Sequence, residues 1–161
     1  MISLSSIPVF APTTAFAPTA GFVSAAGFAR STVFTNGAGS LAAHPAGYAL
    51  LRFTAGARHV DALAELLTQT GALLLARGWN GLLADVRQLP AFSPDALDWL
   101  QHSWFTRVVP QPPRIFKALL LSAHTGVGPA IGQLRAQAPA FTNYAYFVDE
   151  QAAHTYLATL A

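Results

Sequence analysis

The sequence predicts an α/β fold: a single mixed, mostly parallel β-sheet with crossover helices, in the element order β-β-α-β-α-β-α-β-α. From residue 47 onward, short apolar runs alternate with longer amphipathic stretches, which is typical of strands joined by helices. The 161 residues suit one domain. A hydrophobic fraction of 53%, with only 10% charged residues, supplies enough apolar side chains for a core.

Composition divides the chain into residues 1–46 and residues 47–161. The first segment contains one charged residue, Arg30, and several prolines, so we expect an apolar N-terminal arm or extra strands rather than long helices. Phenylalanine recurs in it every six residues, at Phe10, Phe16, Phe22, Phe28 and Phe34. The spacing is either a coincidence of low-complexity sequence or a row of anchors that dock the arm on its own domain or a neighbouring subunit.

A hairpin and a helix are the first regular elements that we expect. Residues 40–43 and 48–54 are two β-prone runs joined by residues 44–47, which favours a hairpin. Residues 59–77 place their leucines on one stripe, which predicts an amphipathic helix, and Gly78 ends it.

The next strand and helix meet at a clear helix start. Residues 82–86 are a short apolar run typical of a buried strand. Ser93 suits the N-cap of the following helix, Pro94 its first position and Asp95 its positive end. We expect four apolar residues on one buried face of this helix: Leu97, Leu100, Trp104 and Val108.

The last third of the chain repeats the alternation of strand and helix. We expect strands within 114–122 and 143–148, and helices near 128–137 and 149–160. The turn before the third helix has the spacing G-x-G-x-x-x-G, whereas a dinucleotide site needs G-x-G-x-x-G. Pro129 also removes a backbone N–H from that turn. We therefore interpret it as a plain turn and expect no cofactor.

Charge and composition exclude several classes of protein. Nine Lys and Arg oppose seven Asp and Glu, and the cations are scattered singly, whereas nucleic-acid binding needs a basic patch. The longest apolar run, 20–29, is too short to span a membrane, and no basic residue precedes Arg30 to make a signal peptide. We expect a cytoplasmic protein without transmembrane segments. The lack of cysteine excludes disulfides and thiol catalysis.

Residues for catalysis or metal binding do not form a recognisable pattern. No Gly-x-Ser-x-Gly elbow is present. Among the five histidines, His102 lies four residues after Asp98, on one helix face, but no third ligand accompanies them. We expect no catalytic residues, no metal and no enzymatic activity.

Residues 47–160 resemble the STAS/SpoIIAA-like group of small bacterial-type domains, which shares its fold with the Sec14-type lipid-binding domains. The residues that carry this resemblance are the run 82–87, the helix 93–100 and Trp104. The resemblance implies a non-enzymatic regulatory domain that binds proteins. Anti-sigma-factor antagonists of this group have a phosphorylatable Ser at the start of the helix after this strand. Ser93 lies close to that position, but Pro94 follows it and the expected glycine is absent.

Six residues are candidates for interaction or regulation. An exposed tryptophan with an arginine nearby would suit a contact patch, although Trp99 packed under a loop is the alternative. The candidates are Asp85, Ser93, Trp99, His102, Phe105 and Arg107. We therefore expect a protein-interaction module that forms a homodimer or binds another protein. The alternative is a pocket beside the sheet that binds a lipid or another apolar small molecule.

Overall fold

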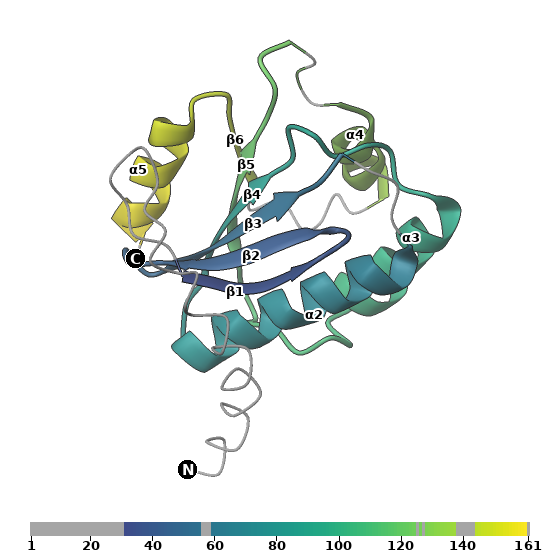
Figure 1. Ribbon diagram of the computed structural model, residues 1–161, viewed down its shortest axis with the longest axis horizontal. Helices are drawn as coiled ribbons and strands as arrows, with labels where there is room; N and C mark the ends of the chain where they lie inside the picture. Colours follow the sequence, from purple (N-terminus) through teal and green to yellow (C-terminus); the bar gives the residue numbers. More distant parts are fainter. Residues whose placement is uncertain (1–30, 56–58, 125, 127, 138–143, 161) are drawn as a thin grey trace.

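Six strands form one sheet in which each strand pairs with its neighbours in sequence (Figure 1). The computed structural model describes residues 31–55, 59–124, 126, 128–137 and 144–160. The first three strands are antiparallel, and the pairs from the third strand to the sixth are parallel. The strands are β1 (Ser31–Asn36), β2 (Gly39–His44), β3 (Tyr48–Phe53), β4 (Gly81–Asp85), β5 (Phe116–Leu120) and β6 (Tyr144–Phe147). This mixed, mostly parallel sheet confirms the predicted fold class.

The N-terminal segment contributes to this sheet. Residues 31–44 form β1 and β2, and the predicted hairpin of β2 with β3 is confirmed, with Leu41 opposite Leu51. Phe34, the fifth of the regularly spaced phenylalanines, lies in β1 and packs against the core. The other four lie in residues 1–30, outside the described residues, so their proposed docking stays a prediction.

The helices cover the two faces of the sheet unequally. The helical segments are α2 (Val60–Arg77), α3 (Pro94–Trp99), the π-helix η3 (Leu100–Trp104), α4 (Gly128–Gln137) and α5 (Glu150–Leu160). The larger core lies on the face with α2, α3, η3 and α4, and a smaller cluster lies under α5 on the other face. None of the described helices is long and apolar enough to cross a membrane.

The predicted helix ends are confirmed at two places. Gly78 ends α2 with a φ of 68°, a left-handed conformation that glycine adopts without strain. The hydroxyl of Ser93 accepts a hydrogen bond from the N–H of Ala96 at 3.2 Å, and Pro94 follows as the first residue of α3.

The predicted burial of Val108 is wrong. The helical run ends at Trp104, and Val108 is 70% exposed, while Leu100 and Trp104 are buried as expected. A π-helix has more residues per turn than an α-helix, so the residues after Leu100 do not stay on the face that a continuous α-helix would give them. Arg107 then takes a positive φ of 64°, which turns the chain away from the helix direction.

Candidate functional site

A buried carboxylate marks the end of β4 where the parallel strands finish. Asp85 is only 5% exposed, and its register partner on β3 is Arg52. The Arg52 Nε donates to Asp85 Oδ2 at 2.9 Å. Arg87 donates from Nε to Oδ1 at 2.9 Å and from Nη2 to Oδ2 at 2.8 Å. Both oxygens of the buried carboxylate are therefore held by guanidinium groups.

These contacts fix the charge of Asp85. Burial acts to raise the pKa of Asp85, but the hydrogen bonds from Arg87 and the charges of Arg87 and Arg52 together outweigh it and lower the pKa. The hydrogen bond to Asp85 in turn raises the pKa of Arg87. Asp85 and Arg87 are therefore both charged at neutral pH.

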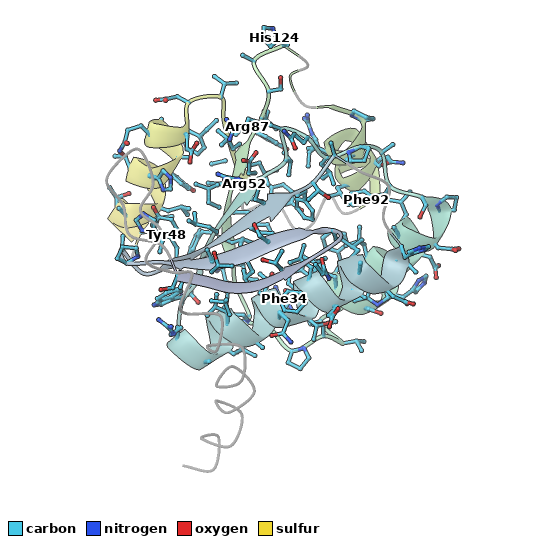
Figure 2. The ribbon with its side chains drawn as sticks, viewed as in Figure 1. Phe34, Tyr48, Arg52, Arg87, Phe92 and His124 are labelled. Atoms are coloured by element: carbon cyan, nitrogen blue, oxygen red, sulfur yellow. The ribbon has the colours of Figure 1, made fainter. Side chains whose placement is uncertain are left out.

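Glu150, the first residue of α5, joins this group from the other side. Its carboxylate lies 3.7 Å from Nη2 of Arg52 and 3.6 Å from Nη2 of Arg87. We call these four residues, Arg52, Asp85, Arg87 and Glu150, the carboxyl-edge cluster. Figure 2 shows Arg52 and Arg87 close together at this end of the sheet. The cluster contains two positive and two negative charges and is neutral as a whole.

A line of buried polar side chains runs from the cluster under α5. The His154 Nε2 lies 3.4 Å from Glu150 Oε2, and its Nδ1 lies 2.5 Å from the hydroxyl of Tyr48. The ring of His44 stacks on Tyr48 at 4.4 Å between centroids. In the described part of the chain, no group of three or more His, Asp or Glu residues is arranged to hold a metal ion.

The carboxyl-edge cluster borders an open hollow rather than an enclosed pocket. The hollow has a volume of about 560 Å³, and Ser40 and Gly39 lie beside Arg52, Asp85 and Arg87 in its lining. A smaller hollow of about 120 Å³ continues along the sheet past Ala42 to Glu150. α5 packs on β4, β5 and β6, which leaves Ser40 and Ala42 half-buried on the same face of β2.

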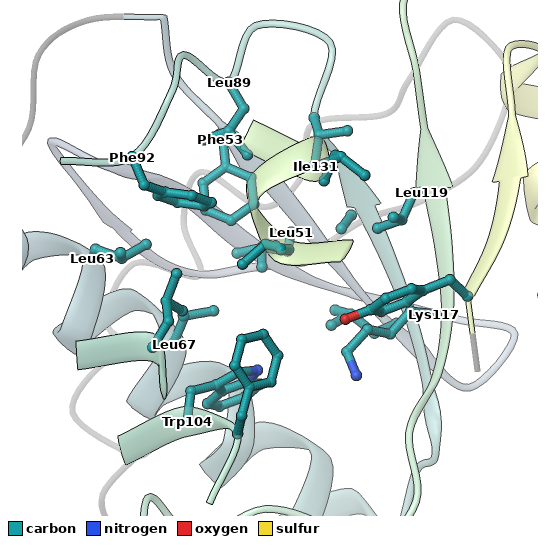
Figure 3. Close-up of a pocket in the computed structure, with 17 residues that line it drawn as sticks. Leu51, Phe53, Leu63, Leu67, Leu89, Phe92, Trp104, Lys117, Leu119 and Ile131 are labelled. Carbon is teal, nitrogen blue, oxygen red and sulfur yellow. The ribbon is translucent and has the colours of Figure 1, made fainter. Parts of the chain in front are cut away.

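A second cavity lies inside the larger core (Figure 3). It has a volume of about 70 Å³ and is lined almost wholly by apolar side chains. Pockets that bind drug-sized ligands measure about 300–1,000 Å³, so this cavity has no room for a lipid. Lys117 lies at its wall, with Nζ 5.3 Å from the centre of the Tyr144 ring.

The structure separates the six candidates that the sequence indicates. Asp85 lies in the carboxyl-edge cluster, and Ser93 caps α3. The other four lie on or after the α3–η3 run. Trp99 is half-buried and Phe105 is buried in the core, whereas His102 is exposed beside Asp98 at 3.1 Å.

Arg107 is placed by the loop that follows η3. Its Nη1 donates to the carbonyl of Pro112 at 2.6 Å, so it holds that loop rather than another candidate. Sequence reasoning missed Arg52, Arg87 and Glu150. Every second residue of a strand lies on the same face of the sheet, and this spacing was the one signal in the sequence that places Arg52 on the face of Tyr48 and Leu50.

Comparisons with known proteins give no sequence match and a weak similarity to a solved structure. No family model matches the chain, and no curated protein sequence matches it. Among solved structures, the chain is similar to an anti-sigma factor antagonist from Mycobacterium paratuberculosis, with 12% sequence identity and a TM-score of 0.43. The match covers 84% of this chain and 98% of that one.

Proposed function

We propose that this chain is a non-enzymatic, STAS-like protein-interaction and regulatory module that self-associates through the carboxyl-edge cluster. The observation that carries the proposal is a neutral, partly exposed arrangement of two arginines and two carboxylates beside an open hollow. A surface of this kind offers polar contacts to another protein.

Contacts within the chain hold the two arginines in place. Their side chains are 49% and 40% exposed for Arg52 and Arg87, yet their guanidinium groups are held by the 7% exposed side chain of Asp85. Arginine is enriched in the central contacts of protein interfaces. Because the side chains are already ordered, binding loses less conformational entropy than it would with free arginines.

The balance of charge favours a second copy of the chain as the partner. A two-fold interface brings the same surface of two copies together, so each charge must meet an opposite charge from the same patch. Arg52 or Arg87 of one copy would face Glu150 of the other. The small side chains of Ser40 and Ala42 beside the cluster allow close approach of two sheet faces.

Binding of an apolar small molecule, the alternative that the sequence left open, has less support. The apolar cavity in the core holds only about 70 Å³. The larger hollows lie at the surface, and the one at the cluster is lined by charged and polar groups. A lipid would need an enclosed apolar volume several times larger than this cavity.

Sedimentation velocity over a range of micromolar concentrations tests self-association. We expect a reversible dimer that weakens about tenfold in Glu150→Gln and weakens further at high salt, because exposed charge pairs are screened. Asp61→Asn, an exposed acid in the first turn of α2, is the matched control and leaves the dimer unchanged. A strict monomer at every concentration, or equal weakening in both variants, contradicts the proposal.

A further inference from the structure

The opposite end of the sheet, where the parallel strands begin, carries a separate hollow. Its volume is about 360 Å³. Its apolar wall comes from β5, α5 and the turn after α2, and three glycines, Ala46 and Asn80 complete the lining. We call it the amino-edge hollow. Its apolar wall is formed by Trp79, Phe116, Leu157 and Leu160, and its glycines are Gly47, Gly78 and Gly81. Figure 1 shows the ends of α2 and α5 at this same end of the sheet.

The chain packs closely at Gly81, in the lining of the amino-edge hollow. A Cβ on Gly81 would lie 3.0 Å from the Cβ of Tyr48, so a side chain is hard to fit at that position. Leu160, at the rim of the hollow, is 45% exposed, and Leu75, near the end of α2 and outside the lining, is 47% exposed.

Two arginines stand over the aromatic walls. The Arg77 guanidinium lies 5.1 Å from the Trp79 ring centre, and that of Arg114 lies 5.9 Å from the Phe116 ring centre. Both arginines are exposed, and neither forms an ion pair with any residue that the structure describes. Their positive charges are available to a ligand that lies across the aromatic rings.

Acidic residues gather at one end of the sheet. All seven acidic residues lie at the carboxyl edge or in the first two turns of a helix that leaves it, and they are Asp61, Glu65, Asp85, Asp95, Asp98, Asp149 and Glu150. The helices return toward the amino edge, where Arg77 ends α2. The macrodipole of a helix favours acids in its first turn and cations in its last, and this arrangement leaves the amino edge with arginines and without acidic side chains.

We propose that the amino-edge hollow is a docking site for an acidic segment of a partner protein. The segment would insert one aromatic or large aliphatic side chain between Trp79 and Phe116 and place its carboxylates on Arg77 and Arg114. The exposed apolar side chains of Leu160 in the lining and of Leu75 outside it fit a peptide better than a small ligand.

The chain's own N-terminal segment does not have the chemistry for this site. Residues 1–30 contain several phenylalanines but no Asp or Glu, so they offer no carboxylate to the two arginines. The proposed self-association surface is at the other edge of the sheet and is neutral. The docking site is thus independent of the function proposed above.

Titration of the isotope-labelled full chain with short capped peptides, followed by NMR, tests the site. The probe has one phenylalanine between aspartates; one matched peptide replaces the phenylalanine by alanine, and another replaces the aspartates by asparagines. We expect the probe to shift the backbone amides of Gly78 and Gly81 but not that of Asp85. Each matched peptide should bind at least about tenfold more weakly, since it lacks either the anchor or the charges.

Variants of the chain separate a specific site from general attraction. The double variant Arg77→Glu with Arg114→Glu should lose binding at least about tenfold. Arg135→Glu is the matched control, because Arg135 is also exposed and also stacks on an aromatic ring, Tyr146, at 5.6 Å. If the double variant does not fold, the single neutral variants Arg77→Gln and Arg114→Gln replace it, with an expected loss of a few-fold each.

Several results would overturn the proposal. Equal shifts with the phenylalanine and alanine peptides would show that nothing enters the hollow. The double variant changes the net charge by −4 and Arg135→Glu by −2, so a loss of binding free energy in the control that is half that of the double variant would show attraction to net charge alone. Binding of phenylacetate as tight as that of the probe would assign the hollow to a small aromatic acid instead. Shifts at Gly78 and Gly81 that depend only on protein concentration would assign it to a second copy.

Discussion

Lys117, the only lysine of the chain, lies at the wall of the core cavity without an acidic partner in the described structure. Burial, with a smaller contribution from the charge of Arg107, lowers its pKa from the usual 10.5 to about 8. Burial likewise raises the pKa of Tyr144, over whose ring the ammonium lies, to about 12. Both shifts favour the uncharged side chains in the folded protein.

These shifts predict how the free energy of unfolding changes with pH. Between about pH 8 and 10.5 the folded chain has lost the Lys117 proton while the unfolded chain keeps it, so stability rises with pH. Above about pH 10 the Tyr144 hydroxyl ionises first in the unfolded chain, and stability falls again. Lys117→Met should abolish the rise and stabilise the protein at pH 7 by about 1–3 kcal/mol. Urea unfolding at a series of pH values measures both effects, and a rise that persists in Lys117→Met contradicts the assignment.

At the same scale, the sequence located Asp85 but not its partners. A strand that ends in an acid is visible in the residues 82–86 alone. Which cations reach that acid depends on the pairing of β3 with β4, which sets Arg52 opposite Asp85. The pairing register is a long-range property, so single-residue patterns did not reveal the carboxyl-edge cluster. The buried contact of Tyr48 with His154, 106 residues later, was hidden for the same reason.

At the scale of elements, local signals in the sequence identified most helices and strands. They failed where tertiary packing determines the local conformation. The N-cap of α3 and the C-terminal glycine of α2 are local chemistry, and both were predicted correctly. The π-helical turn η3 has no signature in the sequence, so the burial of Val108 was predicted wrongly. β1 lacks a clear alternation of apolar and polar residues, and its register shifts between Thr32 and Phe34.

The packing of α2 against the loop after η3 gives a prediction at this scale. A Cβ on Gly71 would lie 2.3 Å from the carbonyl oxygen of Pro110, so Gly71→Ala must push the helix and the loop apart. We expect a loss of about 2–4 kcal/mol in the free energy of unfolding. Gly132→Ala in α4 meets nothing within 4 Å and should instead stabilise by about 0.5–1 kcal/mol. Thermal unfolding of the two variants checks the difference, and a loss of the same size in both contradicts the close approach.

At the scale of the whole molecule, the two ends of the sheet have different electrostatics. The alternation of strands and helices, visible in the sequence, already implies that all helices leave one edge and return to the other. The positions of acids early in helices and of Arg77 late in α2 follow from that pattern. What the sequence did not show is that the amino edge is hollow, since the hollow is formed by residues from four separate parts of the chain.

The two surfaces should act independently at physiological salt and become coupled at low salt. β4 joins the amino-edge hollow at Gly81 to the carboxyl-edge cluster at Asp85, and its five residues span about 13 Å. This exceeds the screening length of about 8 Å at 0.15 M salt but is well below the length of about 30 Å at 0.01 M. At physiological salt, Glu150→Gln should therefore weaken self-association without changing the affinity for the acidic peptide. The double variant Arg77→Glu with Arg114→Glu should weaken peptide binding without changing self-association. At low salt, Glu150→Gln should also tighten peptide binding, because one negative charge of the molecule is removed. Peptide titrations and sedimentation of the same variants at both salt concentrations measure this, and a cross-effect at physiological salt would mean that both variants disturb one shared surface.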